Sequence, residues 1–301
     1  MAFEMAQIIL GLWPMAGITS GHVSREDGLA TIQTAIDAGV TTFDTAYSYG
    51  FEGESDRMLG EVLKRPENRD RGLAVIGKVG QRWSDDRIRV IDATPATLTA
   101  EESLRRIGID QFDLLMLHAV DINVDLRRSA AAIAELQRRG LAKQVGVCNV
   151  NQEELLIFCE QCDCVAIQCP LNIMQRESLD PLISTAHSRG IGVHVYWTLM
   201  KGLLAGKIGR DQTFGPGDSR PRYEIFQGEA RRKSHDFVDR LAEIAARQGT
   251  TVACLSIGWT LSQTGVTAAL VGAKRPEQIA ETVHAKPLAS DVLAEIEAAI
   301  P

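Results

Sequence analysis

The sequence predicts an α/β fold, a (β/α)8 TIM barrel with additional C-terminal helices. Strand-like and helix-like segments alternate along almost the whole chain, and eight segments resemble strands. Some of these are unbroken apolar runs, such as residues 114–117, which is typical of parallel strands buried on both faces. The expected strands are residues 8–13, 40–44, 73–78, 112–118, 143–147, 165–168, 191–196 and 267–271.

Helix signals follow most of these strands. Ser24 is a candidate N-cap for a helix over residues 25–38, and Gly39 would end it. Thr94 followed by Pro95 predicts the start of a helix that ends at Gly108. The other expected helices are residues 55–63, 129–138, a segment beginning near Asn151, 180–190, 276–284 and, as additions to the barrel, 229–247 and 290–299.

An open, doubly wound sheet is the alternative architecture. It is weakened because no Gly-x-Gly-x-x-Gly motif follows any expected strand. The chain of 301 residues is long enough for one barrel or two ordinary domains. No Pro/Ser-rich linker or composition shift divides it, so we predict a single barrel domain over residues 1–301.

Composition narrows the class of partner. The net charge of -7 argues against nucleic acid as the main partner, although a phosphate ligand needs only a few local cations. No apolar run approaches the roughly 20 residues that span a bilayer, and residues 1–5 lack the basic stretch of a secretory signal. We therefore predict a cytoplasmic protein with no membrane, nucleic-acid or specific protein partner.

The six cysteines suggest reduced thiols rather than a disulfide scaffold. Cys159, Cys162, Cys164 and Cys169 lie close together in the sequence, which raises the alternative of a metal site. Metal-binding cysteines usually show recognisable paired spacing, and here the first lies on an expected helix and the last beyond a strand. Free thiols are the preferred interpretation, and no metal is expected.

Four ionisable residues lie where expected strands end: Asp44, Tyr49, Lys78 and His118. In a barrel of parallel strands these ends converge on one mouth, where such enzymes carry out their chemistry. A free tyrosine is a weak acid at neutral pH, and an adjacent ammonium such as Lys78 would lower its pKa. Asp44 would hold Lys78 charged, and His118 would hydrogen-bond a carbonyl oxygen. Each residue alone has an ordinary structural explanation, but the coincidence of four favours an active site.

Several motifs resemble the aldo-keto reductase family, over nearly the whole chain from about Leu10 to His284. They are residues 42–50 with 53–60, residues 103–108 with 113–118, and Gly146-Val-Cys-Asn149. The resemblance implies NADP(H)-dependent reduction of an aldehyde or ketone to an alcohol. Hydride would come from the nicotinamide and the proton from Tyr49. Trp13 matches an aromatic beside the substrate, with a core tryptophan as the alternative.

The resemblance also implies a set of NADP(H)-binding residues: Cys148, Asn149, Gln168, Tyr196, Trp197, Leu199, Gly202, Lys207, Gly272, Lys274, Arg275, Gln278, Glu281 and Thr282. Asn149 and Gln168 would hold the carboxamide, and Tyr196 would stack on the nicotinamide. Residues 199–207 would wrap the pyrophosphate. Lys274 and Arg275 would face the 2′-phosphate, unless they are an ordinary solvated pair.

The chain departs from the family pattern at three places in this set. Cys148 replaces a serine, Trp197-Thr198 replaces Ser-Pro, and Thr282 stands where an asparagine usually contacts the adenine. None of these changes removes one of the four ionisable residues, so the prediction of an active enzyme stands.

Two other functions remain open. One is a Schiff-base aldolase that uses Lys78, and the other is a cofactor-binding regulatory subunit like the potassium-channel β subunits of the same family. The long loop over residues 208–227 is a candidate lid that folds over cofactor or substrate. The sequence does not name the carbonyl substrate.

Overall fold

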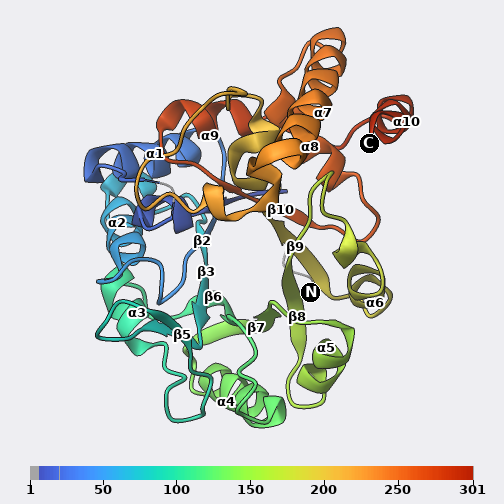
Figure 1. The fold of residues 1–301 in the computed structure, drawn as a ribbon. Coiled ribbons are helices and arrows are strands. Elements are labelled where there is room, and N and C mark those ends of the chain that lie inside the picture. The colour runs from blue at the N-terminus through green and yellow to red at the C-terminus, as the bar shows by residue number, and fades with distance from the viewer. Residues whose placement is uncertain (1–6, 20, 301) are drawn as a thin grey trace.

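The computed structural model describes residues 7–19 and 21–300. Eight parallel strands form the central barrel (Figure 1): β1 (Ile8–Gly11), β2 (Thr42–Asp44), β3 (Ala74–Val79), β6 (Phe112–Leu117), β7 (Ala142–Cys148), β8 (Cys164–Pro170), β9 (Gly192–Tyr196) and β10 (Ala268–Gly272). Their order is β1–β10–β9–β8–β7–β6–β3–β2, and β1 pairs with both β2 and β10. The predicted closed barrel is confirmed, and the open-sheet alternative is wrong because the first and last strands pair.

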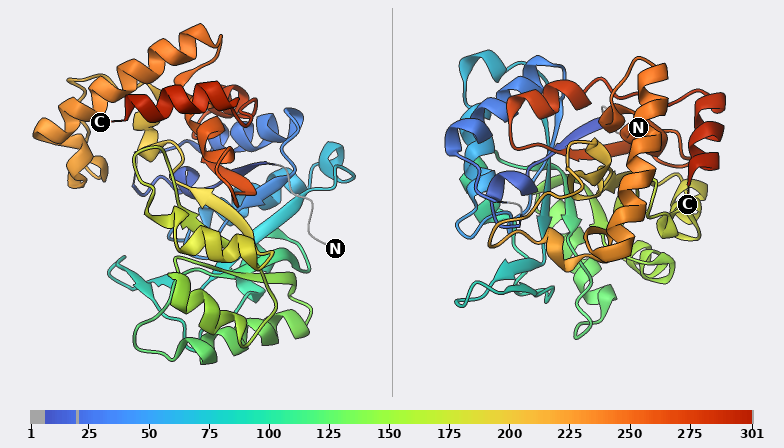
Figure 2. Two further views of the ribbon diagram at one scale, coloured as in Figure 1. Left: turned by 90° about the vertical axis from the view of Figure 1, so that its right-hand side faces the viewer. Right: turned by 45° about the horizontal axis from the view of Figure 1, so that its top comes forward.

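The helices surround this barrel: α1 (Arg25–Asp37), α2 (Glu54–Leu63), α3 (Glu101–Ile107), α4 (Leu126–Arg138), α5 (Gln152–Cys159), α6 (Leu182–Ser188), α7 (Gly228–Arg247), α8 (Val252–Leu261), α9 (Pro276–Thr282) and α10 (Ser290–Ala299). The expected C-terminal additions, α7 and α10, pack against each other at one side of the molecule (Figure 2). No helix in the described part of the chain is long and apolar enough to cross a membrane.

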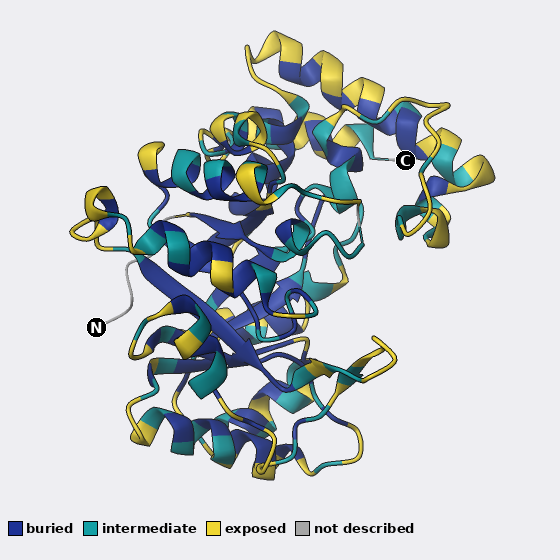
Figure 3. Ribbon diagram, turned by 90° about the vertical axis from the view of Figure 1, so that its left-hand side faces the viewer, coloured by how far each residue is buried: buried dark blue, intermediate teal, exposed yellow. Residues whose placement is uncertain are grey.

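Side chains from alternate strand positions form two apolar clusters. Ile9, Ile76 and Met116 belong to a small cluster contributed by the strands, which we place inside the barrel. Leu115 and Leu117, at the intervening positions of β6, belong to the larger cluster that includes residues from the surrounding helices. Figure 3 shows the strands as the most continuously buried part of the molecule. This alternation decides which strand residues face the barrel axis.

Two predicted helix starts are wrong. Residues 94–97 form a turn, because the hydroxyls of Thr94 and Thr97 bind the Asp92 carboxylate rather than backbone N–H groups of a helix. The helix α3 therefore begins only at Glu101. Helix α4 begins at Leu126, three residues earlier than predicted, because the Asp125 side chain accepts a hydrogen bond from the backbone N–H of Arg127.

The sequence also did not predict two elements. One is the antiparallel hairpin of β4 (Gln81–Trp83) and β5 (Arg89–Ile91), which follows β3. The other is α8, which is apolar all round and buried over most of its length. All six cysteines are free thiols. The described residues contain no group of three or more His, Cys, Asp or Glu side chains placed to hold a metal ion.

The buried carboxyl group of Asp56, on α2, connects this helix to α3 and to the loop after β2. Its two oxygens accept hydrogen bonds of 2.6 Å from the hydroxyls of Thr45 and Ser103. Burial raises the pKa of Asp56 to about 6, although the hydrogen bonds from Ser103 and Thr45 favour the charged form and lower it. The folded protein therefore holds a proton at Asp56 over a pH range in which the unfolded chain has lost it.

This raised pKa predicts a pH-dependent stability. The stabilisation from the bound proton is complete below the ordinary aspartate pKa of 3.8 and is lost as the pH rises through about 6. The free energy of unfolding of the wild type should fall by about 3 kcal/mol between pH 4 and pH 8, and Asp56→Asn should abolish this fall. Urea unfolding of both proteins across this range measures the change. Asp70→Asn, at an exposed position, is the control, and an equal pH slope in wild type and Asp56→Asn would contradict the prediction.

Candidate active site

The four ionisable residues predicted from the sequence lie together at one end of the barrel. Asp44 is the last residue of β2, Lys78 is the penultimate residue of β3, and His118 directly follows β6. Residues two apart on a strand point to the same face. Lys78 follows Ile76 by two positions and His118 follows Met116 by two, so both side chains face the barrel axis, as Ile76 and Met116 do. Tyr49 lies in the loop between β2 and α2, five residues after Asp44.

Lys78 is the centre of the contacts among these groups. Its buried ammonium forms an ion pair with the buried carboxylate of Asp44 and donates to the Tyr49 hydroxyl at 3.1 Å. It also donates to the backbone carbonyl of Thr45 at 3.2 Å. The Tyr49 hydroxyl lies 3.5 Å from Asp44 Oδ1. One phenol, one ammonium and one carboxylate therefore share a single hydrogen-bonded cluster.

Burial sets the charge state of this cluster. Burial raises the pKa of Tyr49 above its ordinary value, and the lowering effect of Lys78 is present but smaller. Lys78 therefore lowers the Tyr49 pKa as expected, but burial outweighs it, and the phenol keeps its proton at neutral pH. Burial is the largest single effect on Lys78 and disfavours its ammonium form, but the Asp44 carboxylate together with Tyr49 and Cys148 outweighs it, so the pKa of Lys78 is raised. Lys78 is therefore charged.

His118 is held neutral. Burial lowers the pKa of this imidazole well below its ordinary value, and the positive charges of Lys78 and Arg89 lower it further. Its Nδ1 atom is buried and has no hydrogen-bond partner among the described residues. A neutral imidazole can donate one hydrogen bond and accept another, which suits contact with a carbonyl or alcohol oxygen.

Two aromatic rings contact the Tyr49 ring. The Trp13 ring meets the Tyr49 ring edge-on at 5.2 Å between centroids, and the His118 ring also meets it edge-on, at 5.7 Å. Trp13 is partly exposed, and its indole N–H donates to the Thr19 hydroxyl at 2.9 Å. This position at the mouth disfavours the core interpretation of Trp13.

Two amide side chains and one phenol lie beside the ionisable cluster. Gln168, on β8, donates from Nε2 to Asp44 Oδ2 at 2.6 Å. Asn149, just after β7, donates from Nδ2 to the His118 carbonyl at 2.8 Å and accepts from the Tyr196 hydroxyl at 2.5 Å. Cys148 is buried, which raises the pKa of its thiol to about 12. The structure thus brings the predicted carboxamide-binding residues to within one or two hydrogen bonds of the ionisable cluster.

The predicted pyrophosphate loop follows β9. Lys201 and Gly202 have φ angles of 54° and 93°, in the left-handed region that glycine adopts without strain. The N–H groups of Gly202 and Leu204 donate to the Leu199 carbonyl at 2.8 and 3.1 Å, which closes a tight turn. Lys207 forms an ion pair with Glu281 of α9, so this loop is joined to the segment after β10.

The segment after β10 carries the predicted 2′-phosphate contacts. Gly272 packs so closely that a Cβ there would lie 2.7 Å from Pro14. Gln278 accepts hydrogen bonds from the backbone N–H groups of Lys274 and Arg275 at 2.8 and 3.3 Å, so it fixes the loop that carries both cations. Thr282 is buried, and its hydroxyl donates to the Gln278 carbonyl of its own helix at 2.9 Å.

Comparison with known proteins identifies the family. The model of the aldo/keto reductase family matches residues 7–301. The chain belongs to the aldo/keto reductase family. It is 31% identical to aldo-keto reductase YhdN of Bacillus subtilis over 92% of this chain and 83% of that protein. It is 29% identical to the NADH-specific methylglyoxal reductase of Escherichia coli over 93% of this chain and 90% of that protein.

A solved structure supports the same conclusion. The glycerol dehydrogenase AKR11B4 from Gluconobacter oxydans superposes with a TM-score of 0.89 at 29% identity, covering 98% of this chain and 91% of that one. Membership confirms the oxidoreductase class and the carbonyl reduction that the family resemblance implied. Aldo/keto reductases use nicotinamide cofactors, so the coarser part of the cofactor prediction is confirmed as well.

The contacts of the candidate lid, residues 208–227, could not be predicted from the sequence. The loop over residues 208–227 contains two short 3-10 turns, Arg220–Arg222 and Glu224–Phe226. The Ser219 N–H donates to the Thr19 carbonyl at 2.9 Å, which joins this loop to the segment after β1. The Tyr223 ring meets the Trp197 ring at 5.9 Å, and the Lys201 ammonium lies 4.4 Å from the Tyr223 centroid. No sequence motif marks these contacts, because they join distant segments.

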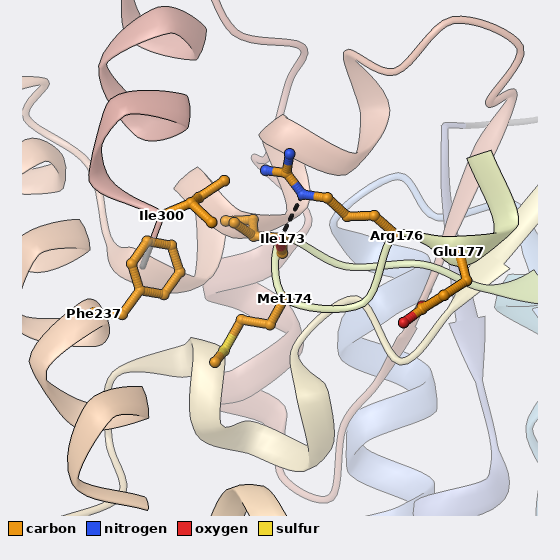
Figure 4. Close-up of a pocket in the computed structure, with 6 residues that line it drawn as sticks. All are labelled: Ile173, Met174, Arg176, Glu177, Phe237 and Ile300. Atoms are coloured by element: carbon orange, nitrogen blue, oxygen red, sulfur yellow. Dashed lines mark hydrogen bonds between the residues drawn. The ribbon is translucent and has the colours of Figure 1, made fainter. Parts of the chain in front are cut away.

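A separate cavity of about 300 Å³ lies beside α7 and α10 (Figure 4). Its lining is Ile173, Met174, Arg176, Glu177, Phe237 and Ile300, so it contains none of the four ionisable residues. The Arg176 guanidinium pairs with Glu297 of α10 and packs 4.6 Å from the Trp259 ring centroid. These contacts hold the C-terminal helix, and the cavity is distinct from the mouth that carries the chemistry.

Proposed function

We propose that this protein reduces a small aldehyde or ketone to an alcohol with a nicotinamide cofactor, and that Tyr49 gives the proton to the carbonyl oxygen. The observation that carries the proposal is the Tyr49 hydroxyl, which lies 3.1 Å from the Lys78 ammonium and whose pKa is raised by burial, so that the proton is available for transfer at neutral pH. Negative charge develops on the carbonyl oxygen during reduction, and a neighbouring ammonium stabilises the tyrosinate that remains after proton transfer. Lys78 would supply this ammonium, and Lys78 and Asp44 together would fix the position of Tyr49. His118 would orient the carbonyl oxygen by a hydrogen bond.

The same contacts disfavour the aldolase alternative. A Schiff-base lysine must lose its proton to attack a carbonyl carbon. Lys78 is instead buried beside the Asp44 carboxylate, which raises its pKa and keeps it as an ammonium. The proposed role of Lys78 is therefore electrostatic.

The donor set at the mouth fits a nicotinamide dinucleotide. Asn149 and Gln168 would hold the carboxamide, with Cys148 beneath them, and Tyr196 and Trp197 would form the wall beside the nicotinamide. The Leu199–Lys207 loop would hold the pyrophosphate through backbone N–H groups, as anion-binding turns do. When bound, this cofactor supplies the hydride. Trp13 would contact the substrate.

The remaining cofactor residues support NADP(H) as our proposal. Lys274 is partly buried, and its pKa is lowered by burial and by the nearby positive charges of Arg220 and Arg275, while Asp218, which pairs with Arg220, raises it. Such a gathering of cations suits a phosphate. Glu281 and Thr282 lie on the helix after this loop, where we place the adenosine half. The NADH-specific relative is the reason to test both cofactors.

Names of relatives suggest the size of the substrate. They include methylglyoxal reductase, glycerol dehydrogenase and, at 27% identity, L-glyceraldehyde 3-phosphate reductase of Escherichia coli. We therefore propose short carbonyl compounds as the substrates.

The free cysteines support our proposal of a reducing, cytoplasmic location. We also propose that residues 1–301 form a single domain and that residues 208–227 close over the bound ligand.

Cofactor oxidation with short aldehydes and ketones tests this function. The wild-type protein should consume NADPH or NADH only when a carbonyl compound is present, and the corresponding alcohol should form in equal amount. Tight cofactor binding without turnover of any carbonyl compound would instead favour the regulatory alternative. Absence of binding of either cofactor would overturn the proposal.

Lys274→Met tests the choice of cofactor. Because a hydrogen bond to a charged group contributes about 1.5–3 kcal/mol, we expect KM for NADPH to rise roughly tenfold to a hundredfold while KM for NADH changes little. Steady-state kinetics with both cofactors measure this. Lys233→Met, on the exposed side of α7, is the matched control. An equal rise in both KM values would show that Lys274 does not contact a 2′-phosphate.

A further inference from the structure

The hairpin β4–β5 lies against the loop that carries Tyr49. In its antiparallel ladder Trp83 stands opposite Arg89, and directly opposite residues share one face of a sheet. The Trp83 indole N–H donates to the Ser48 carbonyl at 3.0 Å, and its ring lies 4.7 Å from the Phe51 ring. Since Ser48 and Phe51 are on either side of Tyr49 in the sequence, the face with Trp83 and Arg89 is turned toward the mouth.

Arg89 reaches from this face to the wall of the active site. Its guanidinium carbon lies 5.1 Å from the centroid of the Trp13 ring. Trp13 also meets the Tyr49 ring edge-on, and Tyr49 in turn meets the His118 ring. The charge of Arg89 is also close enough to lower the pKa of His118. Arg89 is therefore an exposed cation beside the reacting groups.

The other two arginines of the hairpin differ from Arg89. Arg82 pairs with Asp92 at 2.8 Å, and Arg87 lies over the Phe51 ring at 4.7 Å. Within the described chain, Arg89 has no ion pair and no side-chain hydrogen bond, and its ring contact with Trp13 leaves its N–H groups for a ligand. A guanidinium presents five N–H donors in a planar fork that matches carboxylate and phosphate.

We propose that Arg89 binds an anionic group of the substrate, so that the enzyme prefers aldehydes or ketones that carry a carboxylate or phosphate. This inference rests on the proposed carbonyl reduction and adds a substrate class to it. Trp13 would hold the guanidinium in place by the cation–π contact. Arg89 is then a specificity-determining residue outside the proton-transfer cluster, and the mouth of a protein with net charge -7 would still attract an anion.

The test compares matched substrates. Succinic semialdehyde with its uncharged methyl ester reports on a carboxylate, and glyceraldehyde 3-phosphate with glyceraldehyde reports on a phosphate. The variants are Arg89→Met, Arg89→Lys and, as the control from the same hairpin, Arg87→Met. Thermal unfolding checks that each variant is folded.

Wild type should show a higher kcat/KM for the charged member of at least one pair. Arg89→Met should lower this preference about tenfold or more, mainly through KM, because it removes a charge-assisted, bidentate contact. Arg89→Lys should keep part of the preference, and Arg87→Met should keep all of it. The pair whose preference falls identifies the anion.

Two results would overturn the inference, and they are distinguishable. If the uncharged substrates are turned over and the preference is the same in Arg89→Met and wild type, only the role of Arg89 is wrong. If wild type turns over neither member of either pair nor any other carbonyl compound, the proposed function is wrong and this inference falls with it.

Discussion

Replacement of Tyr49 by phenylalanine is expected to lower kcat for carbonyl reduction by about 10²–10⁴-fold, the usual contribution of a general acid. The change removes only the hydroxyl, so the ring contacts with Trp13 and His118 at 5.2 and 5.7 Å can persist. Lys78 keeps its contacts with Asp44 and the Thr45 carbonyl. We therefore expect cofactor affinity to be nearly unchanged. Steady-state kinetics combined with cofactor titration measure both quantities.

Tyr47→Phe is the matched control for this experiment. Tyr47 lies in the same loop, but its hydroxyl donates to Glu102 at 3.2 Å rather than to any group of the ionisable cluster. Loss of activity in both variants would point to damage of the loop. A Tyr49→Phe protein with wild-type kcat would show that another group supplies the proton.

Lys78→Met is expected to have the largest effect on stability. It leaves the Asp44 carboxylate buried, with Gln168 as a remaining side-chain donor. Removal of one partner of a buried ion pair costs about 3–5 kcal/mol, because the other charge stays desolvated. We expect a loss of this size in the free energy of unfolding, measured by urea denaturation, together with loss of turnover.

The double variant Asp44→Asn/Lys78→Met separates charge from packing. It removes both charges, so it should be more stable than Lys78→Met alone. Its activity should stay low, because Tyr49 then lacks the neighbouring ammonium. If the double variant is as unstable as the sum of the single variants, the two residues do not interact energetically and the ion pair does not explain the stability.

The barrel and the ionisable cluster could be predicted from the sequence because both depend on local patterns. Apolar runs mark the strands, and Asp44, Lys78 and His118 mark where three of them end. Closure of the barrel then brings these ends together without further information. The direction of the net shift in the Tyr49 pKa could not be predicted in this way. It depends on the competition between burial and Lys78, and burial is a property of the complete fold.

The elements that were missed have weak or misleading local signals. Helix α8 is apolar on all sides, so it lacks the periodicity that distinguishes a helix from a strand. The strands of the β4–β5 hairpin have only three residues each and include charged side chains. Thr94 followed by Pro95 resembles a helix start, but the Thr94 hydroxyl binds the Asp92 carboxylate instead. The turn brings these two groups together, and the sequence alone does not indicate that turn. Of the missed elements, the hairpin matters more for function, because it carries Arg89.

The pairing of β1 with β10 has a consequence for the synthesis of this chain. Ile8 lies beside Ala269, so the first strand finds one of its two neighbours only after almost the whole polypeptide has left the ribosome. At roughly 5–20 residues per second, the wait is on the order of tens of seconds. During that time one edge of β1 has open N–H and C=O groups that could pair with another chain. The unpaired edge of β1 is therefore exposed before the barrel, and with it the active site, can form.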